Sequence, residues 1–170
     1  MSIHSEHPFA DPADAVRRFR GRLGGAVSLW TAGEGPGRAG LTVSSLMVAN
    51  GTPATVLGLL DPDSDLYDAL ESTGTGVVQL LDWADRGLAD AFGGTAPAPG
   101  GPFRLGTWEQ TPYGPALVGR TRALVRFVRS EDVGWSRLAL AEVDEVVIAE
   151  DDDALEHRRG RYRRPEDRGR

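Results

Sequence analysis

The sequence predicts a mainly β protein, a mostly antiparallel β-barrel with short helices packed on it. The 170 residues include 22 glycines and 11 prolines, which indicates many turns between short elements. Helical and strand-like segments do not alternate along the whole chain, and its last half is a run of strands, which disfavours a doubly wound parallel sheet. A chain of this length suits one hydrophobic core, so we expect a single main domain.

Three helices are expected. The first covers residues 11–23, where an Asp-Pro start precedes apolar side chains at helical spacing. A short second helix over 66–71 follows the cap and turn residues of 61–64. The third covers 82–92 and ends at Gly93-Gly94. The stretch after it, up to Pro102, contains only Gly, Pro, Ala and Thr and is expected to be a surface loop.

Six or seven strands are expected between turns rich in Gly, Pro and Asn. The first two flank a Gly- and Pro-rich turn and should pair as an antiparallel hairpin. A nearly continuous apolar run over 54–60 is typical of a strand buried on both faces. The expected strands cover residues 26–32, 40–48, 54–60, 76–81, 116–118, 123–129 and 138–148.

The composition excludes several kinds of catalytic chemistry. The chain has no Cys, and all 19 of its Lys and Arg residues are Arg. A thiol nucleophile, a disulfide, a Schiff-base lysine and a phosphate loop ending in Gly-Lys-Ser/Thr each need a side chain that is absent. With three His, a zinc site is not expected and no metal is assigned. A bound organic cofactor is therefore expected to supply the reactive group.

The charge is unevenly distributed. The chain carries -6, and residues 157–170 hold seven Arg against one Glu and one Asp, or +5, which leaves -11 on residues 1–156. An acidic body disfavours nucleic acid as a partner. The sequence also lacks an apolar run long enough for a bilayer and an export signal at its start, so no membrane partner and a cytoplasmic location are expected.

The segment 39–45 is unusual for a strand because it carries a glycine and three hydroxyl groups. One interpretation is that Thr42, Ser44 and Ser45 hydrogen-bond a flat polar ligand, which Gly40 allows to approach the backbone. The alternative is that alternate hydroxyls simply face water.

Three motifs in order give the chain a resemblance to a known family. They are Gly40-Leu41-Thr42-Val43-Ser44-Ser45, then Leu88-Ala89-Asp90-Ala91-Phe92-Gly93, and finally His157-Arg158-Arg159-Gly160-Arg161-Tyr162. In this order and spacing the chain resembles the flavin reductase-like family with the FMN-binding split-barrel fold. The resemblance covers 14–164, which leaves 1–13 as an N-terminal extension and 165–170 as a C-terminal tail.

The resemblance implies a homodimer of six-stranded antiparallel Greek-key split barrels that bind FMN, or FAD, near the subunit interface. It implies an enzyme that transfers a hydride from NADH or NADPH to flavin and can supply a flavin-dependent monooxygenase. Such a reaction needs oriented rings more than a protein acid or base, and no catalytic side chain is assigned. The implied cofactor contacts are Thr42, Val43, Ser44, Ser45, Asp61, Asp63, Ser64, Phe92, Arg161 and Tyr162.

The chain departs from the family pattern at two positions. Where relatives have an Asn-x-Ser-Ser-like loop, it has Asp61-Pro62-Asp63-Ser64-Asp65, whose carboxylates repel a phosphate unless arginines intervene. The candidates for this compensation are Arg38, Arg86, Arg159 and Arg161. Where relatives carry Gly-Asp-His, it has Gly134-Trp135-Ser136, so Trp135 is the candidate for the nicotinamide side of the site.

These departures keep other functions open. One alternative is a flavin-binding module with little or no reductase activity, and another is a split barrel that binds a deazaflavin or haem. A hydrolase triad around His157 is disfavoured because no Gly-x-Ser-x-Gly turn is present. A cation site at Asp151-Asp152-Asp153 is disfavoured because the ligand spacing of a calcium loop is missing.

Overall fold

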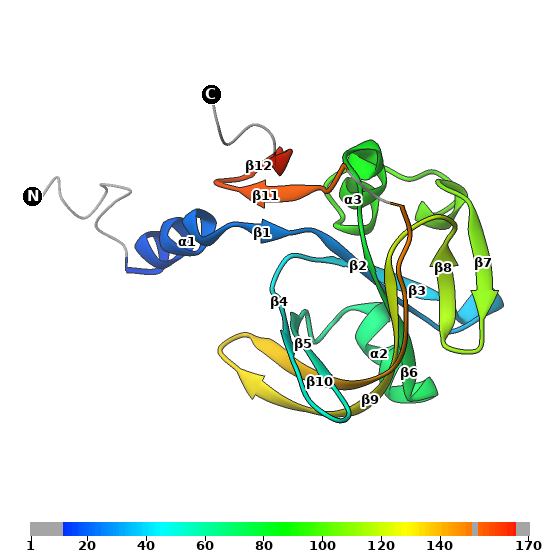
Figure 1. Ribbon diagram of the computed structural model, residues 1–170. Coiled ribbons are helices and arrows are strands. Elements are labelled where there is room, and N and C mark those ends of the chain that lie inside the picture. Colours follow the sequence, from blue (N-terminus) through cyan, green and yellow to red (C-terminus); the bar gives the residue numbers. More distant parts are fainter. Residues whose placement is uncertain (1–11, 151–152, 166–170) are drawn as a thin grey trace, which may run out of the picture.

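A curled antiparallel sheet of seven strands dominates the computed structural model, which describes residues 12–150 and 153–165 (Figure 1). Its strand order is β3-β2-β6-β9-β10-β5-β4. The two longest strands, β9 and β10, pair along their length and form the most extended hairpin. The strands are β2 (Ser28–Ala32), β3 (Ala39–Val43), β4 (Leu46–Ala49), β5 (Thr55–Leu60), β6 (Thr75–Leu80), β9 (Arg122–Val133) and β10 (Ser136–Val147).

The sheet closes on itself at one short break. Strands β3 and β4 are consecutive in the chain, yet they form the two opposite edges of the sheet. Only Ser44 and Ser45 separate them, so the chain passes directly from one edge to the other. The predicted mainly β antiparallel barrel is thereby confirmed. The strand expected over 40–48 is divided in two, so the barrel sheet has seven strands where the resemblance implied six.

Two smaller sheets flank the barrel within the described residues. Strand β1 (Gly25–Ala26) pairs with β11 (Glu156–Arg158), which pairs with β12 (Arg161–Arg163). The other small sheet is the hairpin of β7 (Trp108–Thr111) and β8 (Gly114–Leu117). Of these five short strands the sequence predicted only β8, which was expected at residues 116–118.

The three predicted helices are confirmed. They are α1 (Pro12–Leu23), α2 (Asp65–Thr73) and α3 (Arg86–Phe92). The described residues also contain the single-turn 3-10 helices η2 (Gly35–Gly37), η3 (Trp83–Asp85) and η4 (Pro102–Arg104). Helix α1 projects from the barrel beside the β11–β12 hairpin (Figure 1). None of the helices in the described ranges is long and apolar enough to cross a lipid bilayer. The expected extension and tail fall mainly on residues 1–11 and 166–170, outside the described residues.

The main core fills the barrel around Trp30, which is almost wholly buried. A Cβ on Gly58 would lie 2.7 Å from the Trp30 ring, so this strand position needs glycine. The indole N–H donates to the Ser28 hydroxyl over 3.2 Å, and that hydroxyl donates to the Val43 carbonyl over 2.5 Å. These bonds satisfy the polar atoms of the core and fix the end of β3 next to the break.

A second core joins α3 to the outer face of β3. Phe92 packs edge-on against Phe103 and Trp108, with ring centroids 4.9 and 5.8 Å away. Its ring also covers Gly40, where an added Cβ would lie 2.6 Å from a Phe92 carbon. This cluster holds the Gly- and Pro-rich loop after α3 against the barrel.

Candidate functional site

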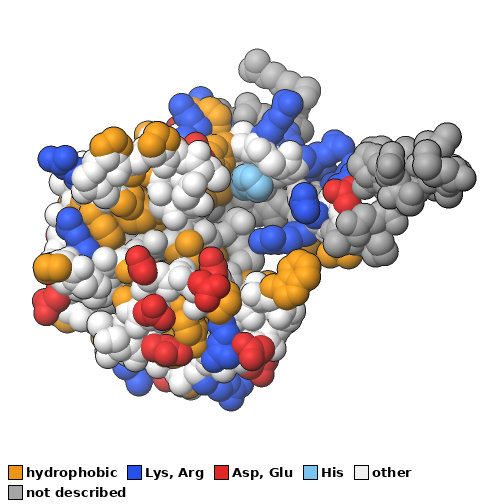
Figure 2. Space-filling model, turned by 180° about the vertical axis from the view of Figure 1, so that it is seen from behind, with side chains coloured by type: hydrophobic (Ala, Val, Ile, Leu, Met, Phe, Trp, Pro, Cys, Tyr) orange, Lys and Arg blue, Asp and Glu red, His pale blue; other side chains and the backbone are white. Residues whose placement is uncertain are grey.

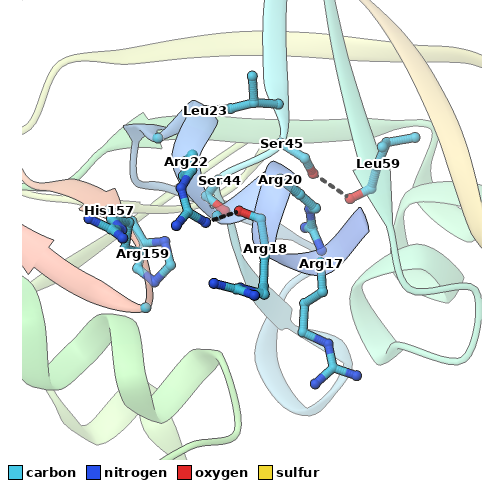
Figure 3. Close-up of a pocket in the computed structure, with 13 residues that line it drawn as sticks. Arg17, Arg18, Arg20, Arg22, Leu23, Ser44, Ser45, Leu59, His157 and Arg159 are labelled. Atoms are coloured by element: carbon cyan, nitrogen blue, oxygen red, sulfur yellow. Dashed lines mark hydrogen bonds between the residues drawn. The ribbon is translucent and has the colours of Figure 1, made fainter. Parts of the chain in front are cut away.

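A cavity of about 690 Å³ opens at the break between β3 and β4 (Figure 3). Three parts of the chain enclose it: the C-terminal half of α1, the break with neighbouring β5, and the turn between β11 and β12. Its volume falls in the range of about 300–1,000 Å³ that is common for small-molecule sites. The lining residues are Arg17, Arg18, Arg20, Gly21, Arg22, Leu23, Gly24, Ser44, Ser45, Leu59, His157, Arg159 and Gly160.

The two serines of the break differ in how they are held. The Ser45 hydroxyl donates to the Leu59 carbonyl over 3.0 Å, which fixes β4 to β5. The exposed Ser44 side chain makes no hydrogen bond to any other described residue. Ser44 therefore offers both a donor and an acceptor to a ligand in the cavity. The structure brings these two predicted residues together at the cavity wall.

Thr42 and Val43 lie on β3 just before the break and do not line the cavity. The Thr42 hydroxyl donates to the Ala89 carbonyl over 2.7 Å and so holds α3. Val43 is buried in the main core. The Phe92 ring lies where a side chain at Gly40 would be, so this glycine accommodates a helix side chain, and Gly40 lines a separate hollow and not this cavity.

Phe92 lines a second hollow of about 620 Å³, which shares no lining residue with the first. Arg38 lies in its wall, with its guanidinium 4.5 Å from the centre of the Phe103 ring. Asp65, the first residue of α2, also lines it. Phe92 therefore does not line the cavity that contains Ser44.

The acidic loop before α2 lines neither hollow at its predicted residues. Asp61 accepts the Asp63 amide over 2.9 Å through its carboxylate, and its carbonyl accepts the Ser64 hydroxyl over 2.7 Å. Ser64 also caps α2 by accepting the Tyr67 amide over 3.2 Å. The loop is thus a self-contained turn and helix cap.

Arg161 and Tyr162 lie on β12, next to the turn that lines the cavity. The Tyr162 hydroxyl donates to the Asp90 carboxylate over 2.7 Å, and its ring packs against His157 at 5.8 Å. Burial, and then the bond to Asp90, raises the pKa of the Tyr162 phenol. Tyr162 therefore fastens the turn to α3, while Arg161 is exposed.

Trp135 lies at the tip of the β9–β10 hairpin and is 94% exposed. It lines neither hollow. In this chain it is a surface side chain that contributes nothing to the cavity wall.

Sequence reasoning missed the four arginines that α1 contributes to the cavity, whereas Arg159 on the β11–β12 turn was among the arginines expected to compensate the acidic loop. Arg17, Arg18, Arg20 and Arg22 all line the cavity, as do His157 and Arg159. The signal was present as four arginines within six residues of a predicted helix, but their direction depends on how that helix meets the barrel. No cluster of His, Asp or Glu suited to a metal ion occurs among the described residues.

The chain matches the family model described as "Flavin reductase like domain" over residues 20–166. It is 36% identical over 161 residues to a protein of Methylorubrum extorquens named FMN reductase (NADH) RutF, covering 91% of this chain and 77% of that one. A protein of the same name from Pseudomonas syringae is 30% identical over 169 residues, covering 95% and 94%.

Solved structures agree on the fold. A putative flavin reductase from Haemophilus somnus superposes with a TM-score of 0.82 at 17% identity, covering 91% of this chain and 99% of that one. The NADH:FAD oxidoreductase SgcE6 of Streptomyces globisporus, solved with NAD and FAD fragments, gives a TM-score of 0.80 at 23% identity, covering 91% and 94%.

Proposed function

Since this chain belongs to the flavin reductase-like family, we propose that it is an oxidoreductase that transfers a hydride from NADH to FMN. The observation that carries this function is the identity of 30–36%, over nearly the whole chain, to proteins named FMN reductase (NADH). The cavity at the break of the barrel supports it, because its size and donor groups suit a phosphorylated aromatic cofactor.

The residues of the cavity fit FMN in three respects. Ser44 has a hydroxyl with no partner among the described residues, which suits the polar edge of a flavin ring. Leu23 and Leu59 offer apolar surface to the ring itself. Among the described residues, five arginines and no carboxylate line the cavity, which suits a phosphate. When bound, the flavin supplies the hydride acceptor, and the chain without Cys or Lys supplies binding and orientation.

We assign direct contacts to Ser44 and Ser45 and supporting roles to the other predicted residues. Thr42 and Val43 hold the break in position through α3 and the core. Phe92 packs behind the same strand. Arg161 and Tyr162 hold the β11–β12 turn, and Tyr162 does so through Asp90. Asp61, Asp63 and Ser64 form a turn outside the cavity, and the role that we propose for them is to support α2, which Ser64 caps.

A homodimer is the assembly that we propose, because α1 carries an uncovered apolar stripe. Val16, Phe19 and Leu23 lie on one helix face and are 64%, 68% and 69% exposed. Met47 and Val48 on β4 are exposed as well. A second copy that covers this stripe would also border the cavity, since Leu23 belongs to both.

The reduced flavin has an expected consumer. Structures of similar fold include the flavin reductase component of a two-component tryptophan halogenase and component B of nitrilotriacetate monooxygenase. We propose that this chain likewise supplies a separate flavin-dependent oxygenase. The cytoplasm, where NADH is regenerated, is the compartment that we propose for this reaction.

The function is tested by following NADH oxidation at 340 nm with purified protein and added FMN. Turnover that requires both the protein and FMN is the expected result. Binding of FMN without turnover, with NADH and with NADPH, would instead indicate a flavin-binding module. Ser44→Asp is expected to abolish FMN binding by placing a carboxylate in the cavity, while the exposed control Arg129→Gln on β9 is expected to behave as the wild type.

A further inference from the structure

Three arginines of the cavity have no partner within the described part of the chain. Arg17 and Arg20 on α1 and Arg159 on the β11–β12 turn line the cavity, and their guanidinium groups make no ion pair or hydrogen bond with other described residues. We call these three residues the arginine wall. The ion pairs of the described residues use other arginines: Arg120, Arg122, Arg126, Arg137 and Arg164.

The charge around the cavity is opposite to the charge of the chain. The chain carries -6, whereas the described residues that line the cavity include five arginines, one histidine and no carboxylate. Figure 2 shows basic side chains gathered around the histidine, while most acidic side chains lie lower on the same face. Concave surfaces lined by one sign of charge raise the local concentration of the opposite ion. The cavity therefore favours an anionic ligand.

The backbone at Arg159 supports a role for its side chain. Arg159 has φ +55°, the one positive φ of a non-glycine residue among those described, and Gly160 follows at φ +77°. Two consecutive residues of this kind form the tight hairpin turn in which Asn and Gly are strongly preferred. The Arg159 amide donates to the Gly21 carbonyl over 2.8 Å, which fixes the turn against α1. Any residue can supply this amide, so the turn alone does not explain an arginine at this position.

We propose that Arg17, Arg20 and Arg159 bind a phosphoryl group of a nucleotide substrate, either the phosphate of FMN or the diphosphate of NADH. This assignment rests on the proposed function, because the cavity is the one that we give to FMN. Guanidinium groups bind phosphate oxygens through paired charge-assisted hydrogen bonds. Ser44 and Ser45 come from the barrel and the arginines from α1 and the turn (Figure 3). A nucleotide can thus meet hydroxyls at its ring and cations at its phosphate.

The acidic loop strengthens the case for this wall. The family pattern implies a phosphate contact at Asp61–Ser64, yet here that loop bonds to itself and carries carboxylates. A phosphate would be repelled there and attracted by the wall. The wall therefore supplies a charge complement that this chain lacks at the loop.

The first test compares ligands with and without phosphate by equilibrium titration of flavin fluorescence. Arg159→Gln and the double variant Arg17→Gln, Arg20→Gln are compared with wild type for FMN and for riboflavin. The expected result for a flavin phosphate is a Kd for FMN raised about tenfold per lost contact, with the Kd for riboflavin unchanged. Arg129→Gln removes one unpaired exposed arginine outside the cavity and is expected to change neither.

The second test distinguishes the two sources of phosphate. If the wall binds the dinucleotide, the KM for NADH rises about tenfold while the KM for dihydronicotinamide riboside, which has no phosphate, and the Kd for FMN stay unchanged. Either pattern supports the proposal and identifies the source. Equal losses for the phosphate-free partners, or no loss for any ligand, would overturn it.

A glycine variant separates a binding role from a structural one. Arg159→Gly suits the positive φ and should keep or raise the melting temperature. It is nevertheless expected to weaken the binding of the phosphate-bearing ligand as much as Arg159→Gln does. Unimpaired binding by Arg159→Gly would contradict the proposal. The flavin titrations need no turnover. A chain that binds FMN through the arginine wall and fails to oxidise NADH would therefore refute the proposed enzymatic function and leave the phosphate assignment standing.

Discussion

Ser45 and Leu59 exchange two hydrogen bonds where the barrel closes. The Ser45 hydroxyl donates to the Leu59 carbonyl over 3.0 Å, and the Leu59 amide donates to the Ser45 carbonyl over 3.1 Å. The side chain of Ser45 thus continues the pairing that the backbone break interrupts. Ser44, one residue earlier, is left to face the cavity. One serine therefore serves the fold, and its neighbour is available to a ligand.

This difference predicts opposite effects of two alanine variants. Ser45→Ala loses a hydrogen bond and is expected to lower the free energy of unfolding by about 1 kcal/mol. Ser44→Ala loses no hydrogen bond to another described residue, so stability should stay within about 0.5 kcal/mol of wild type while FMN binding weakens. Urea unfolding and FMN titration of both variants check this pair. A stable Ser45→Ala with an unstable Ser44→Ala would reverse the assignment.

A methyl group on Gly40 is expected to disturb α3. The added Cβ would lie 2.6 Å from the Phe92 ring, which is itself confined by Phe103 and Trp108. Gly40→Ala should therefore lower the free energy of unfolding by about 1–3 kcal/mol. Combining it with Phe92→Leu should cost less than the sum of the two single changes, because the smaller side chain makes room. Additive costs in urea unfolding would show that Phe92 does not cause the crowding.

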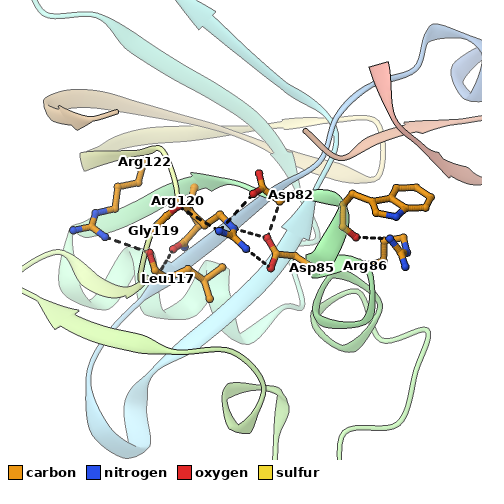
Figure 4. Close-up of polar contacts among 9 residues, drawn as sticks. Asp82, Asp85, Arg86, Leu117, Gly119, Arg120 and Arg122 are labelled. Atoms are coloured by element: carbon orange, nitrogen blue, oxygen red, sulfur yellow. Dashed lines mark hydrogen bonds and ion pairs between the residues drawn. The ribbon is translucent and has the colours of Figure 1, made fainter. Parts of the chain in front are cut away.

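Arg120 joins the start of α3 to the strand that follows the β7–β8 hairpin. Figure 4 shows its guanidinium between two aspartates. It donates to both carboxylate oxygens of Asp85, over 2.7 and 3.0 Å, and lies 3.5 Å from Asp82. The Asp82 amide also donates to Asp85 over 2.8 Å, which closes the turn.

Removing the Arg120 guanidinium leaves the neighbouring carboxylates of Asp82 and Asp85 without the cation between them. Arg120→Met is expected to lower the free energy of unfolding by about 1–3 kcal/mol, since both aspartates are largely buried. Urea unfolding measures the loss. The triple variant Arg120→Met, Asp82→Asn, Asp85→Asn should recover part of it, because the repulsion disappears with the charges. A triple variant less stable than Arg120→Met would point to hydrogen bonding as the dominant contribution.

The barrel could be predicted from the sequence because its signals are local. The apolar run of β5 and the strand-rich second half specify an antiparallel sheet without any long-range information. The division of 40–48 at Ser44 could not be predicted in the same way. It depends on β3 pairing with β2 and β4 pairing with β5, which makes β3 and β4 the two opposite edges of the sheet. This arrangement is a property of the closed barrel.

The site was only partly predictable for the same reason. Hydroxyls inside a strand are a local anomaly, so Ser44 and Ser45 were found. Thr42 looks the same in sequence, yet its hydroxyl is taken by Ala89 on a helix 47 residues later. The arginines of α1 reach the cavity only because the β11–β12 turn and α1 meet, through Arg159 and Gly21.

An exposed ionic group on the outside of the barrel predicts a pH dependence. Hydrogen bonds from Arg126 and from Tyr113 hold the pKa of the Asp144 carboxyl below its ordinary value of 3.8. A carboxyl whose folded pKa is lowered stabilises the fold above its unfolded pKa, and that contribution disappears as the pH falls through the folded pKa. The stabilisation by Asp144 is thus complete at neutral pH and absent in strong acid.

Asp144→Asn should therefore lower the urea midpoint at pH 7, and its difference from wild type should shrink as the pH falls below the ordinary carboxyl pKa of 3.8 toward the lower folded pKa. Glu145→Gln is the control, since this neighbouring carboxylate is exposed and has no hydrogen bond or ion pair to another described residue. A difference between wild type and Asp144→Asn that grows in acid would contradict the lowered pKa.

The apolar stripe on α1 predicts the surface through which two copies of the chain assemble. Phe19 is 68% exposed at the centre of the stripe, and a stable interface is expected to bury such an aromatic side chain. Phe19→Glu should convert the proposed homodimer to a monomer in sedimentation at micromolar concentration, because an unpaired carboxylate would be buried in the interface. The control Val128→Glu changes an apolar residue on β9 that is 51% exposed and lies away from the stripe, and should leave the mass unchanged. Since Leu23 belongs both to the stripe and to the cavity, the monomeric variant should also bind FMN more weakly. A monomer with unchanged FMN affinity would show that one chain completes the site by itself.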